Sequence, residues 1–208
     1  MTDGGGVDRR GHGAPEPPLG DDDGIARLIL VNGPPASGKS TVARRYVDDH
    51  DGATLVEVDT FRMTLPGWET DGSTRLAARD LAGAALVERL RSGSDVVMPQ
   101  FFGQLGYIAV LDELTREHDA TFVEVILAMD AALAVDRFRA RRRALADQDE
   151  HHPEQDIADA DVERFIVDAV ERLERLPTAR PRTHVVPVTR TMSEHEVYRR
   201  VCAEVDGS

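Results

Sequence analysis

The sequence predicts an α/β fold, with a parallel sheet of about five strands covered by helices on both faces. Two observations predict this fold class. Short apolar runs alternate with stretches of helical periodicity along the chain, and this alternation is typical of right-handed β–α–β crossovers. The 208 residues are 41% hydrophobic and 30% charged, which is typical of a globular protein that buries one substantial core.

The predicted strands are short apolar runs that end in polar or glycine-rich sequence. They cover residues 26–32, 54–58, 95–98, 121–128 and 184–188. Helical spacing of apolar residues predicts helices between and after them. These helices cover residues 39–49, 74–91, 106–118, 131–146, 162–173 and 194–205. Ligands of such sheets bind beyond the carboxyl ends of the strands, so the residues after each strand are the candidates for chemistry.

Two of the helices carry more specific predictions. In the helix over residues 74–91, four apolar positions fall on one face, namely Ala77, Leu81, Ala84 and Val87. Ser193 and Glu196 form the pattern of a capping box, which predicts the start of the last helix.

The first 24 residues differ in composition from the rest of the chain. They contain glycines, prolines and the acidic run 21–23, with few branched apolar residues. Such a segment buries too little surface to offset the entropy lost on ordering. We therefore predict a disordered tail over residues 1–24 and one folded domain over residues 25–208.

Charge and cysteine content exclude several classes of protein. The chain has 25 basic and 38 acidic side chains and a formal net charge of −13, whereas bulk nucleic acid and anionic membranes require clustered cations. No apolar run approaches the roughly 20 residues that cross a bilayer. Cys202 is the only cysteine, which excludes an internal disulfide and a multi-thiolate zinc site. We expect a cytoplasmic protein, monomeric or homodimeric, that does not bind membranes, and the charge disfavours nucleic acid as a partner.

The strongest motif follows the first predicted strand. Residues 33–41 read GPPASGKST, which satisfies the phosphate-loop pattern G-x-x-x-x-G-K-[ST] between a strand and a helix. Glycines let backbone N–H groups turn around a polyphosphate, and the helix N-terminus adds favourable partial charge. Lys39, the only lysine, is predicted to reach the β- and γ-phosphates, and the Ser40 hydroxyl to bind Mg²⁺. The predicted nucleotide-binding residues here are Gly33, Pro35, Ala36, Ser37, Gly38, Lys39, Ser40 and Thr41.

Missing motifs exclude other nucleotide-dependent classes. A GTPase normally recognises guanine through N-K-x-D, and this chain has no second lysine to supply that element. The H-R-D and D-F-G motifs of protein kinases are also absent. A small phosphotransferase remains.

Three features together resemble the small P-loop kinases. They are the phosphate loop, the D-x-x-R element at Asp59–Arg62, and an arginine-bearing helix over residues 131–146. The order of elements over residues 26–205 is similar to that of gluconate and shikimate kinases. The D-x-x-R element is more similar to the chloramphenicol phosphotransferase, zeta-toxin and polynucleotide 5′-kinase group. The resemblance implies a three-layer P-loop NTPase fold with an arginine-bearing lid, ATP and Mg²⁺ as cofactors, and a hydroxyl acceptor.

The D-x-x-R element is predicted to serve the acceptor. Asp59 closes the second predicted strand. In the kinases that this chain resembles, an aspartate there accepts the proton of the acceptor hydroxyl or holds Mg²⁺ through water. Arg62 is expected to share its face and to orient the acceptor or a phosphate oxygen. The alternative is a helix-capping aspartate with a surface ion pair.

Aromatic side chains suggest an acceptor pocket. Gln100 and Phe102 follow the third predicted strand, and Trp68 lies in the loop over residues 65–73. Binding pockets are mostly apolar with a few placed polar groups. The predicted substrate-binding residues are Asp59, Arg62, Trp68, Gln100 and Phe102. The alternative is that the aromatic residues belong to the ordinary core.

The helix after the fourth strand carries five arginines within seven residues, namely Arg137, Arg139, Arg141, Arg142 and Arg143. Arg137 and Arg141 have i, i+4 spacing and share one face. This pair resembles the lid arginines that close over ATP phosphates, and the stretch 147–156 is predicted to be a mobile part of the lid. The alternative is a solvated helix neutralised by Asp130 and Asp136.

The sequence thus predicts an ATP- and Mg²⁺-dependent phosphotransferase that moves the γ-phosphate to a hydroxyl of a small molecule, such as an antibiotic or another secondary metabolite. Its predicted catalytic residues are Lys39, Asp59, Arg62 and Arg141, and its predicted metal ligands are Ser40 and Asp59. A 5′-polynucleotide kinase and a toxin-like nucleotide-sugar kinase stay open as alternatives. So does a regulatory module that binds ATP without transferring phosphate.

Overall fold

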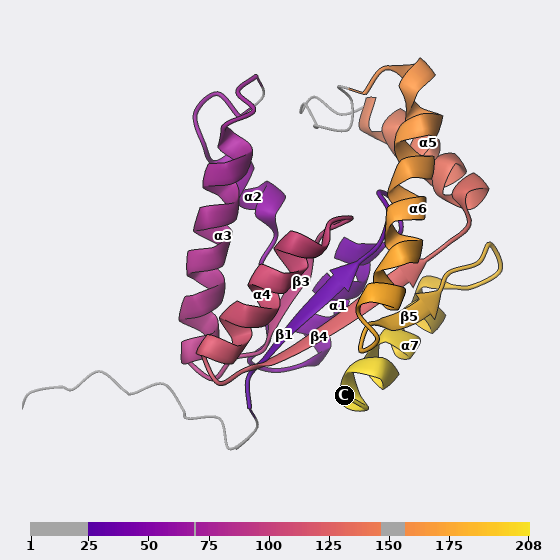
Figure 1. Cartoon of the computed structure of the whole chain (residues 1–208). Coiled ribbons are helices and arrows are strands. Elements are labelled where there is room, and N and C mark those ends of the chain that lie inside the picture. The colour runs from indigo at the N-terminus through magenta and orange to yellow at the C-terminus, as the bar shows by residue number, and fades with distance from the viewer. Residues whose placement is uncertain (1–24, 69, 147–156) are drawn as a thin grey trace, which may run out of the picture.

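The computed structural model describes residues 25–68, 70–146 and 157–208. The predicted tail (1–24) and the predicted mobile stretch (147–156) lie outside the described residues. Five parallel strands form one sheet in the order β2-β3-β1-β4-β5, with helices on both faces (Figure 1). The strands are β1 (Arg27–Asn32), β2 (Thr54–Leu55), β3 (Val96–Pro99), β4 (Thr121–Ala128) and β5 (His184–Pro187). The predicted fold class is confirmed.

Helices occupy the segments between and after the strands. They are α1 (Lys39–Asp49), α2 (Val58–Met63), α3 (Thr74–Arg91), α4 (Leu105–Glu117), α5 (Ala131–Ala146), α6 (Val162–Ala179) and α7 (Glu194–Asp206). Every predicted helix is present, and α2 is additional. A short 3₁₀ turn (Asp159–Asp161) precedes α6.

The central strand β1 sets the position of the site. It pairs with β3 on one side and with β4 on the other. From β1 the chain crosses to one half of the sheet for β2 and β3, and later to the other half for β4 and β5. The loop after β1 therefore lies where the strand order changes direction, which is where open α/β sheets bind their ligands.

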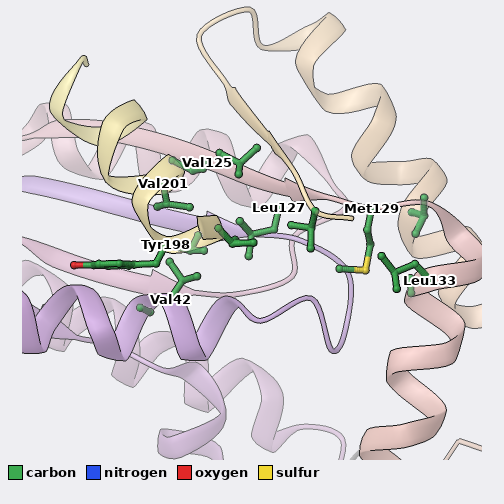
Figure 2. Packing of buried hydrophobic residues seen from close by; sticks show 14 of the residues in the cluster. Val42, Val125, Leu127, Met129, Leu133, Tyr198 and Val201 are labelled. Atoms are coloured by element: carbon green, nitrogen blue, oxygen red, sulfur yellow. The ribbon is translucent and has the colours of Figure 1, made fainter. Parts of the chain in front are cut away.

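Two hydrophobic cores cover the two faces of the sheet. The first core joins the sheet to α1, α5 and α7, and Figure 2 shows Val42 of α1, Leu127 of β4 and Val201 of α7 within this one cluster. The second core lies on the opposite face, where Leu28 and Leu30 of β1 pack with residues of α3, α4 and α6. Strands buried on both faces need apolar side chains on both, and this explains the continuous apolar runs in the sequence.

The buried face of α3 differs from the apolar face that the sequence suggested. The residues that α3 buries are Thr74, Ala78, Ala82, Leu86 and Leu90, whereas Ala77, Leu81 and Ala84 are exposed. Small and apolar residues occur on more than one side of this helix, so its periodicity does not choose between the faces. Packing against α2 and the sheet makes the choice.

The second strand is shorter than predicted. It ends at Leu55, and one further ladder bond runs from the Val56 N–H to the Val97 carbonyl at 3.0 Å. The parallel register would bring Pro99 to the next pairing position, and proline has no N–H to donate. The chain turns into α2 at Val58, so Asp59 lies in the first turn of a helix and not at the end of a strand.

The predicted start of the last helix is confirmed. The Ser193 side chain caps α7 by accepting a hydrogen bond from the Glu196 N–H at 3.1 Å. None of the helices in the described part of the chain has the length and apolar character that crossing a membrane requires.

Candidate active site

The phosphate-loop motif occupies the turn between β1 and α1. Helix α1 begins at Lys39, with Gly38 as its N-cap residue. No acidic residue lies in its first turn, so no carboxylate from that turn neutralises the positive end of the helix dipole. The motif therefore has the strand–loop–helix context that anion binding requires.

The backbone of the loop adopts left-handed conformations at three positions. The φ angle is 156° at Gly33, 61° at Ala36 and 96° at Gly38. At Gly33, a Cβ atom would lie 2.7 Å from Ser37 Oγ and 3.1 Å from the Leu127 carbonyl oxygen, so only glycine fits there. Ala36 holds a conformation that costs a residue with a side chain about 1 kcal/mol or more. Such strain is concentrated in loops that bind ligands.

Two side chains of the loop fit the phosphates of a nucleotide. The Ser37 Oγ atom is buried and has no hydrogen-bond partner among the described residues. The Lys39 Nζ atom donates to the Pro34 carbonyl at 2.9 Å, which holds the ammonium group against the loop. Phosphate oxygens satisfy both a buried hydroxyl donor and an ammonium group.

Magnesium would find few protein ligands at this site. Ser40, the second residue of α1, is half-buried. Within residues 25–68, 70–146 and 157–208, no group of three or more His, Cys, Asp or Glu side chains could hold a metal ion. Mg²⁺ commonly takes one or two protein ligands and completes its shell with phosphate oxygens and water. The residues present therefore fit a magnesium ion that arrives with a nucleotide.

Asp59 is exposed in the first turn of α2. Its carboxylate has neither a hydrogen bond nor an ion pair with any residue that the structure describes. The N-cap residue of α2 is Glu57, so the alternative of Asp59 as a helix cap with a surface ion pair does not match the structure. The carboxylate is accessible to an incoming group.

Arg62 is buried, with 8% of its surface exposed. Its Nη2 atom donates to the Trp68 carbonyl at 2.8 Å, and its Nε atom donates to Thr74 Oγ1 at 3.5 Å. The guanidinium centre lies 5.8 Å from the centroid of the Trp68 ring. Arg62 thus holds the loop that carries Trp68 against α2 and α3. The sequence did not predict this role, and the predicted contact of Arg62 with an acceptor stays a prediction.

The residues after β3 divide between the core and the edge of the sheet. Phe102 is 6% exposed and belongs to the second core. Its ring stacks on that of Tyr107, with the centroids 5.7 Å apart. Gln100 is half-buried, and its backbone N–H donates to the Val31 carbonyl at 3.1 Å. For Phe102 the structure matches the alternative of an ordinary core residue.

A cation and an aromatic ring that the sequence did not single out lie between α3 and α4. Arg79 donates to the Tyr107 hydroxyl, and its guanidinium centre lies 4.0 Å from the centroid of the Tyr107 ring. No carboxylate of the described residues lies within ion-pair distance of Arg79. No local pattern marks this pair, because only the packing of two helices brings it together.

Two arginines of α5 form ion pairs with residues outside this helix, and a third does not. Arg139 forms an ion pair with Glu163 at 3.6 Å and Arg142 with Asp159 at 2.7 Å, which ties α5 to α6 and the turn before it. Arg137 is half-buried and has no hydrogen bond or ion pair with the described residues. Among the predicted lid arginines, Arg137 is thus one whose charge is not paired with a carboxylate of the described residues.

The two acidic residues of the alternative interpretation, Asp130 and Asp136, have partners other than the arginines of α5. Asp130 Oδ1 accepts a hydrogen bond from the Leu133 N–H at 2.8 Å and caps the start of α5. Asp136 forms an ion pair with Arg190, in the loop after β5. Neither Asp130 nor Asp136 thus forms an ion pair with an arginine of α5 among the described residues, and the choice between a lid and a solvated helix stays a prediction.

An apolar cavity of about 510 Å³ lies beside the phosphate loop, between α6 and the ends of β4 and β5. Pro34 contributes to its wall, together with Val170 and Val188. The charged side chains among the described residues that line it are Asp130 and Glu174, both acidic. A triphosphate does not suit this cavity, so the loop itself is the better phosphate site.

The comparison with known families gives one match. A family model described as an AAA domain matches residues 28–164, which include the phosphate loop, α2 and α5. No curated protein matches the sequence.

Several solved structures share the fold. The tunicamycin resistance protein of Deinococcus radiodurans has a TM-score of 0.59 and 15% identity, over 86% of this chain and 95% of that chain. A gluconokinase from Sinorhizobium meliloti has a TM-score of 0.56 and 19% identity, over 88% and 93%. The Pnkp1/Rnl/Hen1 RNA repair complex contains a chain with a TM-score of 0.58 and 18% identity, over 76% of this chain. This chain spans 49% of that chain, or about half its length. At these identities the likeness concerns the fold.

Proposed function

The chain belongs to this AAA-domain family, and from that premise we propose that it is an ATP- and Mg²⁺-dependent phosphotransferase that moves the γ-phosphate to a hydroxyl of a small molecule. One observation carries the proposal. The phosphate loop lies where the strand order of the sheet changes direction, with a buried hydroxyl, that of Ser37, which lacks a partner among the described residues.

The phosphate side of the reaction is assigned to the loop and to the start of α1. Backbone N–H groups of the loop and Lys39 would bind the β- and γ-phosphates, and Ser40 would hold Mg²⁺. A Mg²⁺ ion held by Ser40 would help to neutralise the charge of the phosphates. Lys39 and Arg137 would stabilise the negative charge on the transferring group, and Arg141 shares the face of Arg137 through its i, i+4 spacing.

The acceptor side is assigned to Asp59. An exposed carboxylate without an ion pair among the described residues can accept a hydrogen bond from the acceptor hydroxyl, orient it, and take its proton. Gln100 and Trp68 are assigned to the walls of the acceptor site, on the strength of their positions after β3 and after α2.

The names of the structural neighbours suggest which acceptors to test. They include a gluconokinase and a tunicamycin resistance protein, so the panel contains sugar acids and hydroxyl-bearing antibiotics. One neighbour belongs to an RNA repair complex, so the panel also contains a 5′-hydroxyl oligonucleotide.

The test measures ADP formation that depends on the acceptor. The purified protein is incubated with Mg·ATP and each member of the panel, with Lys39→Ala as the inactive control. We expect at least one small molecule to raise ADP formation in the wild type and not in the variant. Activity on the oligonucleotide alone, with affinity that falls steeply with salt, would favour the polynucleotide kinase. Tight ATP binding without transfer to any acceptor would leave the regulatory module.

A further inference from the structure

We propose that Asn32 is a positioning residue that couples the phosphate loop to the loop after β3, so that nucleotide binding sets the position of the acceptor side. This inference rests on the proposed function for its kinetic consequences. The coupling itself is inferred from the hydrogen-bond geometry alone.

One buried amide makes the connection. Asn32 ends β1 and is fully buried. Its Oδ1 atom accepts hydrogen bonds from the Gly33 N–H at 2.9 Å and from the Phe102 N–H at 3.0 Å. Its Nδ2 atom donates to the Phe102 carbonyl at 3.0 Å. A single side chain thus binds the first residue of the phosphate loop and both backbone polar groups of one residue 70 positions away.

Glu124 fixes the orientation of this amide. Its Oε1 atom lies 3.5 Å from Asn32 Nδ2. A reversed amide would point its oxygen at this carboxylate and at the Phe102 carbonyl, and its NH₂ group at two N–H donors. Glu124 is itself 3% exposed and accepts hydrogen bonds from Arg180 Nε and Thr183 Oγ1, both at 2.9 Å. The carboxylate is therefore held in place from its other side.

The contact is concentrated in this residue. The last backbone bond between the two segments runs from the Gln100 N–H to the Val31 carbonyl. Beyond it, the side-chain hydrogen bonds of Asn32 to Phe102 join residues 32–41 to residues 100–104. A shift of Gly33 on closing around phosphates would therefore be transmitted to Phe102 and its neighbour Gln100. Small errors in the position of an acceptor cost a large part of the transfer rate.

The first experiment measures the coupling without any phosphate transfer. The Phe102 amide resonance is followed by NMR during titration with Mg²⁺ and a non-hydrolysable ATP analogue. We expect the resonance to shift in the wild type and to lose most of that shift in Asn32→Ala. Thr115→Val is the matched control, because Thr115 is also fully buried and hydrogen-bonded, to the Asp112 carbonyl. It should keep the wild-type response.

The second experiment measures the kinetic consequence. In Asn32→Ala, we expect kcat/KM for the acceptor to fall about tenfold or more, since two buried N–H groups lose their acceptor. The dissociation constant of Mg·ATP should change less than about threefold, and a general loss of structure would not produce this split. If Asn32→Ala does not fold, Asn32→Ser is measured with the same expectations, because a serine hydroxyl is too short to bridge to both polar groups of Phe102.

The outcomes separate the two proposals. A wild type that transfers phosphate to no acceptor, yet shows the Phe102 shift and loses it in the variant, overturns the proposed function and keeps the coupling. A wild type that is active, with an Asn32→Ala variant of unchanged acceptor kinetics and an unchanged Phe102 response, overturns the coupling.

Discussion

The phosphate side and the acceptor side of the candidate site are built in different ways. The phosphate side is one continuous segment, Gly33–Thr41, whose backbone conformation follows from its own glycines and from the helix that it starts. The acceptor side is assembled from α2, α3, α4 and the loop after β3, which are separate in the sequence. Several of its side chains are already occupied with one another, as Arg62 is with Trp68 and Thr74.

A sequence motif is therefore more informative about the phosphate side than about the acceptor side. A phosphate loop binds mainly through its backbone, so the motif and its context carry most of the information. An acceptor site binds through side chains, and a side chain such as that of Arg62 instead holds neighbouring elements together. We therefore expect variants of the phosphate side to lose activity and keep their stability. A variant of Arg62, on the acceptor side, should instead lose stability more than activity.

The largest effect is expected for Lys39→Ala. Loss of the ammonium group should lower phosphate transfer by about 10³-fold or more, because it removes a charge that stabilises the transferring group. Acceptor-dependent ADP formation measures this. The control is Arg45→Ala on the same helix, where Arg45 pairs with Asp49 and lies over the Tyr198 ring. That variant should keep its transfer rate, and an active Lys39→Ala enzyme would contradict the assignment.

The next effect is expected for Asp59→Asn. If the carboxylate takes the proton of the acceptor, kcat should fall by about 10²-fold or more while the affinity for Mg·ATP stays nearly constant. Steady-state kinetics and calorimetry measure the two quantities. Glu57→Gln is the matched control, since this neighbouring carboxylate pairs with Arg44. Near-normal turnover in Asp59→Asn would remove Asp59 as the base.

Arg137→Ala tests the lid. We expect kcat to fall by about 10-fold or more, since an arginine at the transferring phosphate can supply several orders of magnitude. Arg139→Ala should change kcat little, because Arg139 pairs with Glu163 at 3.6 Å. Loss of this exposed pair should cost at most about 1 kcal/mol of stability, so the variant stays folded. Equal kcat values for the two variants would show that Arg137 does not stabilise the transferring phosphate.

Arg62→Ala should show its main effect on stability. Two hydrogen bonds from a buried cation are lost, which should lower the free energy of unfolding by about 1–3 kcal/mol in a urea titration. Arg75→Ala, at an exposed position of α3, is the control and should be neutral. Unchanged stability with a raised KM for the acceptor would instead favour the orienting role that the sequence suggested.

The smallest effect concerns the core behind the phosphate loop. Burial raises the pKa of Tyr46 from 10.0 to about 12. Its phenol therefore ionises first in the unfolded chain, and stability should fall as the pH rises above 10. The difference from Tyr46→Phe should reach about 1 kcal/mol at pH 11. Urea unfolding of both proteins at pH 9 and pH 11 measures it, and parallel pH profiles would contradict the assigned burial.

Much of the fold could be predicted from the sequence, because apolar runs and helical periodicity are local signals. These local signals gave wrong predictions where tertiary packing decides, for example which of two similar helix faces is buried. The face of α3 was wrong because Ala78 and Ala82 are as small as the alanines on the exposed side. The end of β2 was wrong because Pro99 on the neighbouring strand, and not the sequence of β2 itself, stops the pairing.

The candidate site shows the same limit. The strand–loop–helix position of residues 33–41 could be predicted, because the loop closes within nine positions, and the roles of these residues stay predictions. The contacts of Arg62, of Arg79 with Tyr107, and of Asn32 with Phe102 join segments that only the fold brings together. Two features of the sequence did mark this contact. Asn32 is a polar residue directly before the phosphate loop, and Glu124 is the only charged residue of an apolar strand. Neither feature indicates which residue it contacts.

The most direct test of the account is a calorimetric titration of the folded protein with ATP in the presence of Mg²⁺. We expect saturable binding of one ATP per chain, with an affinity that falls at least about tenfold in Lys39→Ala. An absence of binding heat with ATP and with every other nucleoside triphosphate, across several temperatures and in a protein whose unfolding transition is intact, would contradict it.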